Sequence, residues 1–234
     1  HYARVEQDVK TGRWLLKKAL DDKKDQTYVL YQLTQQQLAH VLFPLGALRK
    51  QEVRAIASRY GLINAHKPDS QDICFVPDGD YAAFIREDTG LTFPQGRFID
   101  ADGNTLGTHQ GMIHYTVGQR KGLGIAFGRP MYVLAKNAQE NTVMLGPDEA
   151  LFSREMLVER LNFISIEALS APLHVRAKTR YRHAAKPATL YPAGENCIRV
   201  IFDEPQRAIT PGQAAVFYED DVVVGGGTIA AASR

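Results

Sequence analysis

The sequence contains only two cysteines, Cys74 and Cys197, among its 234 residues. Two cysteines cannot build a disulfide framework, and no histidine stands at ligand-like spacing from either, which argues against a zinc site. No apolar run approaches the roughly 18 residues that cross a bilayer, and no charged start followed by an apolar stretch marks a secretory signal. We therefore expect a cytoplasmic protein whose thiols stay reduced.

An excess of charge of one sign is also missing. The 28 lysines and arginines nearly balance the 26 acidic residues, which leaves a net charge of +2. Any contact with a polyanion must therefore come from a local patch. Hydrophobic residues make up 44% and charged residues 23%, as in a globular protein with one large domain or two to three small ones. Because the chain opens at His1 directly in a strand-like pattern, we interpret it as part of something longer.

The first 75 residues are expected to hold two short strands and then helices. Residues 2–5 and 14–16 flank a polar turn containing Gly12, which predicts a hairpin. Apolar residues recur at helical spacing from position 28, Thr34 is a suitable N-cap for a helix through Leu38 and Val41, and a further helix is predicted over 50–60. A short apolar strand is expected at 73–76.

Glycine becomes dense between residues 77 and 146, and the pattern turns extended after one short helix near Tyr81. Asp80 or Asp78 would cap that helix. Strands at 131–134 and 142–145 bracket a polar turn and predict a hairpin. From residue 152 onward, short strands alternate with turn residues, which predicts a small barrel or sandwich.

Cys74 is the residue whose side chain could carry nucleophilic chemistry. A thiolate is a strong nucleophile and can hold a second sulfur atom, but the neighbouring Asp72 opposes ionisation of the thiol. Free cysteine is also among the residue types most often buried. The local pattern alone therefore favours a structural cysteine, and Cys197 is assigned to packing.

Residues 118–124 combine glycines with Arg120 and Lys121, so main-chain N–H groups and positive charge could hold a phosphate there. A solvated turn explains the same pattern equally well. Lys24 and Asp25 precede a predicted helix, whose N-terminus would also favour a phosphate.

A basic run lies further along the chain, within the predicted barrel. Arg176, Lys178, Arg180 and Arg182 share one parity, so an extended segment would present all four charges on one face. Such a face can follow the backbone of an RNA. A charged edge strand that resists aggregation is the alternative.

Several short sequence words occur in the order in which they appear in one family, the bacterial tRNA-specific 2-thiouridylases, which install the 2-thio group on the wobble uridine of certain tRNAs. The chain resembles this family over nearly its whole length. The words are HYAR at 1–4, KDQTY at 24–28, FPLG at 43–46, DSQDICF at 69–75, GQRKGLG at 118–124, KTRYR at 178–182 and TPGQA at 210–214.

The resemblance implies an α+β to mainly β fold in three parts. These are the C-terminal end of a Rossmann-like ATP-pyrophosphatase domain over 1–80, a small central β-rich domain over 81–148 and a C-terminal β-barrel over 149–234. The family's pyrophosphate loop for ATP and its first catalytic cysteine have no counterpart in this sequence. ATP and Mg²⁺ would therefore serve the full-length enzyme, and this fragment alone is expected to be inactive.

The resemblance also makes Cys74 the catalytic cysteine that carries a persulfide. In the family, ATP adenylates the uridine O2, and the persulfide then delivers sulfur to C2, which requires a base held against the sulfur. The implied partners are tRNA and a persulfide sulfur-donor protein, and a monomer is expected. The implied tRNA contacts are His1, Lys24, Asp25, Gln26, Arg180, Tyr181 and Gln213.

Two other functions fit parts of the same pattern. A non-catalytic RNA-binding β-barrel module would need only the basic run of the predicted barrel. A redox or thiol-transfer protein centred on Cys74 would need a resolving cysteine, and no sequence cue places Cys197 nearby.

Overall fold

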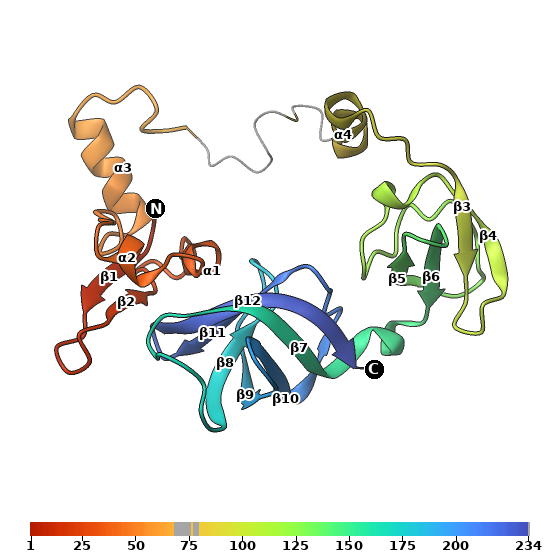
Figure 1. Ribbon diagram of the computed structural model, residues 1–234. Coiled ribbons are helices and arrows are strands. Elements are labelled where there is room, and N and C mark those ends of the chain that lie inside the picture. The colour runs from red at the N-terminus through yellow and green to blue at the C-terminus, as the bar shows by residue number, and fades with distance from the viewer. Residues whose placement is uncertain (68–75, 77–79, 234) are drawn as a thin grey trace. The chain divides into compact units, whose positions relative to one another are not determined.

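The computed structural model describes residues 1–67, 76 and 80–233, and Figure 1 shows its elements in chain order. The chain divides into two compact units. Unit 1 combines His1–Lys67 with Ser153–Arg234, and unit 2 is Pro68–Phe152. Unit 1 is therefore discontinuous in sequence. The three-part division at residues 80 and 148 stays a prediction.

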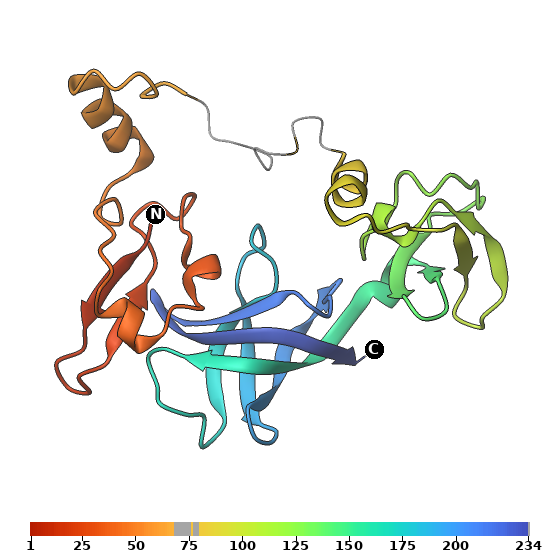
Figure 2. The same ribbon diagram turned by 45° about the horizontal axis from the view of Figure 1, so that its top comes forward.

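A closed six-stranded β-barrel forms the second half of unit 1, which confirms the barrel expected after residue 152. The strand order is β12-β11-β8-β9-β10-β7, and pairing of β12 with β7 closes the ring. Figure 2 shows these two strands side by side. The strands are β7 (Phe152–Phe163), β8 (Leu173–Lys178), β9 (Lys186–Pro192), β10 (Cys197–Arg207), β11 (Ala214–Glu219) and β12 (Val222–Ser233).

The barrel interior is filled by apolar side chains from every strand. In β10, Ile198, Val200 and Phe202 are buried at a period of two, as expected for a strand with one face in a core. Arg199, between them, is exposed. Full burial of each such apolar side chain contributes about 1.5–3 kcal/mol, so the alternation fixes the register of the strand.

The predicted N-terminal hairpin is confirmed as β1 (Arg4–Gln7) and β2 (Trp14–Lys17), which pair antiparallel. β2 adds to the barrel sheet, because Lys17 pairs with Val222 of β12. An ion pair between Arg4 and Asp221, 2.7 Å long, joins the same two regions. The hairpin is thus attached to the barrel by both main chain and side chains.

Two single-turn helices, α1 (Thr27–Leu30) and α2 (Gln35–Leu38), follow the hairpin. Thr34 caps α2 as predicted, but the helix ends at Leu38 and does not continue to Val41. The Gln35 side chain bonds both the N–H and the carbonyl of Trp14, and Leu38 is fully buried. Contacts with the rest of unit 1 therefore hold this short helix in place, since a single turn is not stable by itself.

Gly226 lets the N-terminal segment lie directly on β12. A Cβ at this position would stand 2.5 Å from a ring carbon of Tyr31 and 2.6 Å from the carbonyl oxygen of Ala215. Tyr31 belongs to an apolar cluster that joins this segment to the barrel. The cluster comprises Ala3, Leu16, Tyr28, Tyr31, Leu38, Ile164, Val216, Tyr218 and Val223.

The helix predicted over 50–60 is confirmed as α3 (Lys50–Arg59), followed by Gly61 at a φ of 65°. It buries none of its residues, and Ile56 is 38% exposed. No helix in the described part of the chain is long and apolar enough to span a bilayer.

Unit 2 holds α4 (Tyr81–Thr89) and a four-stranded sheet. Asp80 caps α4 as predicted, because its carboxylate accepts the Ala83 N–H at 2.9 Å. The sheet order is β4-β3-β6-β5, with β3 parallel to β6. The predicted hairpin is confirmed as β5 and β6. The strands are β3 (Gly96–Ile99), β4 (Thr105–His109), β5 (Tyr132–Asn137) and β6 (Thr142–Gly146).

Candidate nucleic-acid interface

The basic run begins in β8 but does not stay extended. β8 ends at Lys178, and the chain then turns, with the His183 N–H bonded to the Arg180 carbonyl at 3.1 Å. The prediction that Arg176, Lys178, Arg180 and Arg182 share one strand face is therefore wrong beyond Lys178. The turn places Arg180 and Arg182 close to the end of β8. An extended strand would instead have spread these charges along its length.

Lys178 lies between two tyrosine rings that come from distant parts of unit 1. Its Nζ is 5.5 Å from the ring centre of Tyr28 in α1 and 5.6 Å from that of Tyr181 in the turn. The two ring centres are 6.0 Å apart. Tyr28 is buried, whereas Tyr181 is 45% exposed, so the pair offers solvent one aromatic ring beside an ammonium group. Rings and cations in this arrangement bind nucleobases and phosphates.

Arg180 connects this pair to the loop before β11. Its guanidinium donates to the Ala208 carbonyl and to Thr210 Oγ1, both at 3.0 Å. The same loop carries Gln213, which is exposed and whose carbonyl accepts the Ile229 N–H at 2.8 Å. We call the residues Tyr28, Lys178, Arg180 and Tyr181 the basic tyrosine surface.

Positive charge is concentrated at this surface. Burial lowers the pKa of Lys178, and the nearby Lys18 lowers it further while Asp25 opposes the shift. Burial and Arg207 lower the pKa of Arg180. The pKa of His183 falls for the same reasons, burial first and then the neighbouring cations. A bound polyanion would relieve this repulsion.

Two buried tyrosine hydroxyls anchor the surface. Burial raises the pKa of Tyr28 to about 12, and its hydroxyl donates to the Ala214 carbonyl at 2.9 Å. Burial also raises the pKa of Tyr218, whose hydroxyl lies 3.3 Å from Thr27 Oγ1. These bonds hold α1 against β11, so the position of the Tyr28 ring is set by the barrel.

Asp25 and Gln26 have structural bonds of their own. Asp25 accepts the Ala19 N–H at 3.1 Å and the Thr27 hydroxyl at 2.6 Å, and Gln26 accepts the Tyr2 N–H at 2.8 Å. Both residues therefore fix the loop that leads into α1. This helix has a single turn, too short for the N-terminal phosphate site that the sequence suggested.

The other predicted tRNA contacts lie in the same unit but outside the basic tyrosine surface. Lys24 is partly exposed in the loop before α1, and its N–H bonds the Asp21 carbonyl at 2.9 Å. His1 is exposed, with its ring centre 6.4 Å from that of Phe43. Cys74 and the strand predicted at 73–76 fall on residues 68–75, outside the described residues except for Val76.

The structure adds Tyr28 to the residues predicted from sequence and gives Lys178 its two ring partners. Lys178 was visible in the basic run, but its ring partners were not. In the sequence, Tyr28 occupies an apolar position of a predicted helix. Only the fold shows that its ring lies beside Tyr181, in the turn after β8. The basic run had already suggested RNA binding for Lys178, whereas Tyr28 stood out in the sequence only as that apolar position and as the last residue of the word at 24–28.

Comparison with known families places three successive domain types along the chain. Residues 1–78 match the model of a tRNA methyl transferase HUP domain, residues 83–147 that of a tRNA methyl transferase PRC-barrel domain, and residues 153–229 that of an aminomethyltransferase β-barrel domain. The class defined by this fold is therefore a protein that joins a HUP domain, a PRC-barrel domain and an aminomethyltransferase-type β-barrel domain.

Curated relatives narrow the class to one family. The chain is 52% identical to the tRNA-specific 2-thiouridylase MnmA of Clostridioides difficile, 53% to that of Acetivibrio thermocellus and 54% to MnmA 1 of Thermoanaerobacter pseudethanolicus. Each match covers 98% of this chain and 63%, 64% and 63% of the respective relative. The chain belongs to the tRNA-specific 2-thiouridylase family and spans less than two thirds of the length of these relatives.

Proposed function

We propose that the protein acts in tRNA 2-thiolation, the transfer of persulfide sulfur to C2 of the wobble uridine in tRNA anticodons. The names of relatives more than 50% identical over 98% of the chain carry this proposal. The basic tyrosine surface supports it, because it combines the predicted contacts Arg180 and Tyr181 with Lys178 and Tyr28.

In this proposal the chain contributes RNA binding and the sulfur-carrying cysteine. The basic tyrosine surface neutralises phosphates and stacks a base, and the loop held by Asp25 and Gln26 keeps it in place. Cys74 carries the persulfide supplied by a sulfur-donor protein. The family's pyrophosphate loop for ATP is not among the words found in this sequence, so the proposal assigns ATP and Mg²⁺ to the full-length enzyme.

The proposal is tested by Cys74→Ser in the complete enzyme. We expect 2-thiouridine to be lost while tRNA affinity stays near the wild-type value, because the change removes the sulfur carrier and little surface. Mass spectrometry of digested tRNA measures the product. It also separates sulfur-for-oxygen exchange from methyl addition, the chemistry named by two of the matching family models. Wild-type 2-thiouridine from the variant would refute the role of Cys74.

The alternative is a non-catalytic RNA-binding module, and the position of the whole basic tyrosine surface within unit 1 favours it for this 234-residue chain. We expect this chain to bind tRNA without ATP-dependent thiolation. A gel shift at several salt concentrations measures the binding, and its salt slope counts the phosphates engaged. Turnover by the purified chain would overturn the expected inactivity.

A further inference from the structure

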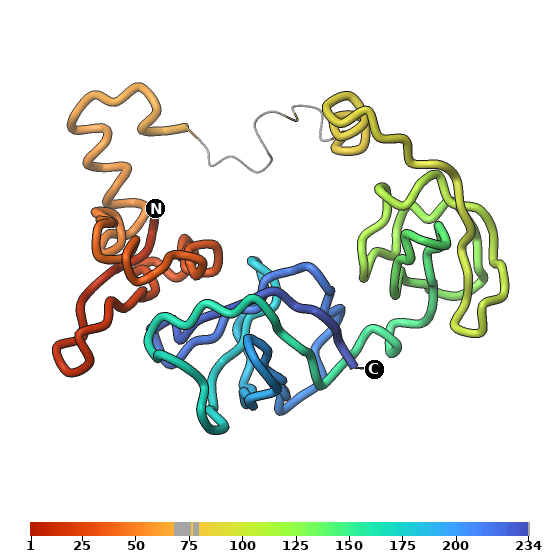
Figure 3. The backbone as a smooth tube through the Cα atoms, viewed as in Figure 1, coloured from red at the N-terminus to blue at the C-terminus, as the bar shows by residue number. Residues whose placement is uncertain are grey.

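Unit 2 carries a cavity formed by a single loop, residues 120–131, directly before β5. Two hydrogen bonds close the base of the loop by joining the residues before it to Val133 in β5. The Gln119 carbonyl accepts the Val133 N–H at 2.9 Å, and the Gly118 N–H donates to the Val133 carbonyl at 2.8 Å. The cavity volume is about 640 Å³. It is lined by Arg120, Gly122, Leu123, Gly124, Ile125, Ala126, Phe127, Gly128, Arg129, Pro130 and Met131. Figure 3 shows the loop as an excursion of the chain ahead of β5.

The main-chain N–H groups of this loop are open, although the Lys121 carbonyl accepts from the Gln119 side-chain amide at 3.0 Å. Apart from Pro130, which has no N–H, each residue from Arg120 to Met131 has a main-chain N–H with no acceptor in the described ranges. Gly122 and Gly124 adopt φ angles of 76° and 74°, a backbone that other residues rarely take. Successive unpaired N–H groups in such a backbone form anion-binding concavities, and they need a partner from outside the chain.

Two arginines add charge to the cavity. Arg120 and Arg129 are exposed, and neither has a hydrogen bond or an ion pair to any residue that the structure describes. No acidic side chain lines the cavity. An anion entering it would therefore meet two uncommitted guanidinium groups, which bind phosphate oxygens in a forked geometry.

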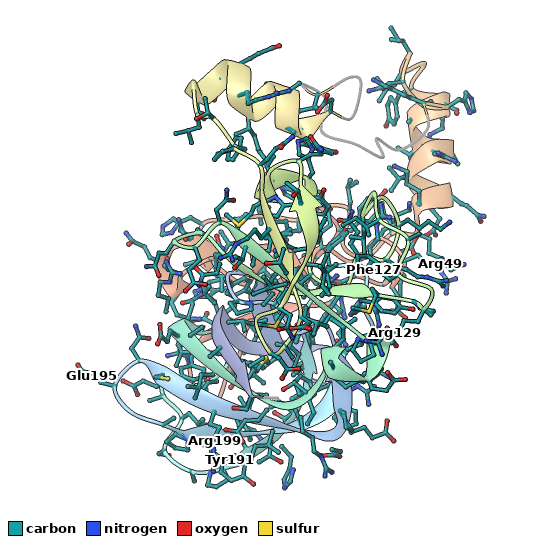
Figure 4. The ribbon with its side chains drawn as sticks, turned by 90° about the vertical axis from the view of Figure 1, so that its right-hand side faces the viewer. Arg49, Phe127, Arg129, Tyr191, Glu195 and Arg199 are labelled. Carbon is teal, nitrogen blue, oxygen red and sulfur yellow. The ribbon has the colours of Figure 1, made fainter. Side chains whose placement is uncertain are left out.

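The floor of the cavity is apolar and fixed. Phe127 is partly buried and packs on the core of unit 2, and Leu123 and Met131 belong to that core. Figure 4 labels Phe127 and Arg129 on this loop. A flat apolar side chain beside two guanidinium groups suits a nucleotide, with its base or sugar on the ring and its phosphate on the arginines.

We propose that the 120–131 loop of unit 2 is a second RNA-binding site, which holds a phosphodiester of the tRNA backbone through Arg120, Arg129 and the loop N–H groups. The inference rests on the proposed function for the identity of the RNA. An RNA backbone is the source favoured over a free nucleotide, because both arginines are exposed and all the residues that line the cavity come from one exposed loop, so a long polyanion can reach it. The site extends RNA contact from unit 1 to unit 2.

The direct test follows the backbone amides of the complete 234-residue chain by NMR, with an unmodified tRNA transcript, AMP and inorganic phosphate as separate probes. We expect tRNA to shift or broaden the Gly122 and Gly124 signals at concentrations where AMP and phosphate leave them in place. Equal shifts with AMP or phosphate would assign the site to a free nucleotide or ion and overturn the proposal. An absence of shifts with tRNA would also overturn it.

The second test compares Arg129→Gln and Arg120→Gln with Arg86→Gln, which removes the same charge from an exposed arginine of α4 outside the cavity. We expect each loop variant to weaken tRNA binding and to reduce the slope of log affinity against log salt by roughly 0.7–0.9. The Arg86 variant should keep the wild-type slope. Equal slopes in all three variants would contradict the site.

The tests distinguish failure of the second RNA-binding site from failure of the proposed function. If tRNA binds and is thiolated by the complete enzyme while the loop amides stay unshifted, the second site is wrong and 2-thiolation stands. If the loop amides shift with tRNA but the complete enzyme makes no 2-thiouridine, the site stands and the proposed reaction is wrong.

Discussion

At the scale of single residues, Lys178 is the central residue of the basic tyrosine surface in unit 1. Its Nζ lies at similar distances from a buried ring, Tyr28, and an exposed ring, Tyr181. The buried ring is held by the barrel, and the exposed ring is free to stack. Lys178 therefore joins the two rings, and in the proposed function the exposed ring of Tyr181 would contact the RNA.

Replacement of Tyr181 by alanine should weaken tRNA binding by about 1–3 kcal/mol, the contribution of one stacked base. Tyr181→Phe keeps the ring and should retain most of the affinity. Tyr191→Ala is the matched control, since Tyr191 also has an arginine over its ring, Arg199 at 5.4 Å, as Figure 4 labels on the barrel. Fluorescence anisotropy with labelled tRNA measures all three. Equal losses at positions 181 and 191 would remove the case for a specific stacking site.

His109 makes unit 2 sensitive to acid. It is fully buried, and its Nδ1 accepts the Gly111 N–H at 3.1 Å, so the ring is neutral with its proton on Nε2. Burial lowers its pKa below the ordinary value. Below about pH 6.5 the unfolded chain therefore takes up a proton before the folded one does, and stability falls as the pH drops towards the folded pKa.

The matching prediction is a pH-dependent thermal midpoint for unit 2 that is lower at about pH 5.5 than at about pH 7.5. His109→Gln should reduce this pH dependence, because the titrating group is gone, while His114→Gln, at an exposed position, should leave it unchanged. Differential scanning calorimetry at both pH values measures the midpoints. A pH response of the same size in the His109 variant would show that another group is responsible.

At the scale of elements, local sequence predicted α3, α4 and both hairpins because each depends on neighbours in the chain. The Asp80 cap, for instance, acts within one helical turn. The ends of α2 and β8 were not predicted, because contacts with residues remote in the sequence surround them. Gln35 at the start of α2 bonds Trp14, 21 positions away, and Arg180 after the end of β8 bonds Ala208, and neither contact is visible in the local sequence.

Gly226 is the element-scale contact most sensitive to substitution. Gly226→Ala should lower the free energy of unfolding of unit 1 by about 1–3 kcal/mol, because its methyl group would overlap the Tyr31 ring and the Ala215 carbonyl. Gly12→Ala is the control: its added Cβ meets nothing within 4 Å, so only the strain of its φ of 71° remains. Urea unfolding measures both. A smaller loss at Gly226 than at Gly12 would show that Tyr31 can move aside.

At the scale of the whole molecule, the site could not be predicted from sequence because it is assembled from remote segments. Tyr28 and Ala214, which share a hydrogen bond, are 186 positions apart. Family resemblance supplied Arg180, Tyr181 and Gln213, and the fold supplies their neighbours. The role of Cys74 as the sulfur carrier stays a prediction, since Cys74 lies outside the described ranges.

The two units have separate apolar cores and should unfold in two transitions. Trp14, the single tryptophan, lies in β2 of unit 1, so its fluorescence reports that unit alone. We expect calorimetry to detect a transition that Trp14 fluorescence does not follow, and His109→Gln to move only that transition. One shared transition by both methods would indicate that the cores unfold together.

The discontinuity of unit 1 sets an order for folding during translation. The β1–β2 hairpin leaves the ribosome before unit 2, yet its packing partners Val216 and Val223 are made only after all of unit 2 has been synthesised. Unit 2 can therefore reach its native state while Leu16 and Tyr31 are still without their final neighbours. Nascent chains are most exposed to misassembly and to chaperone capture in that interval, before β12 closes the barrel.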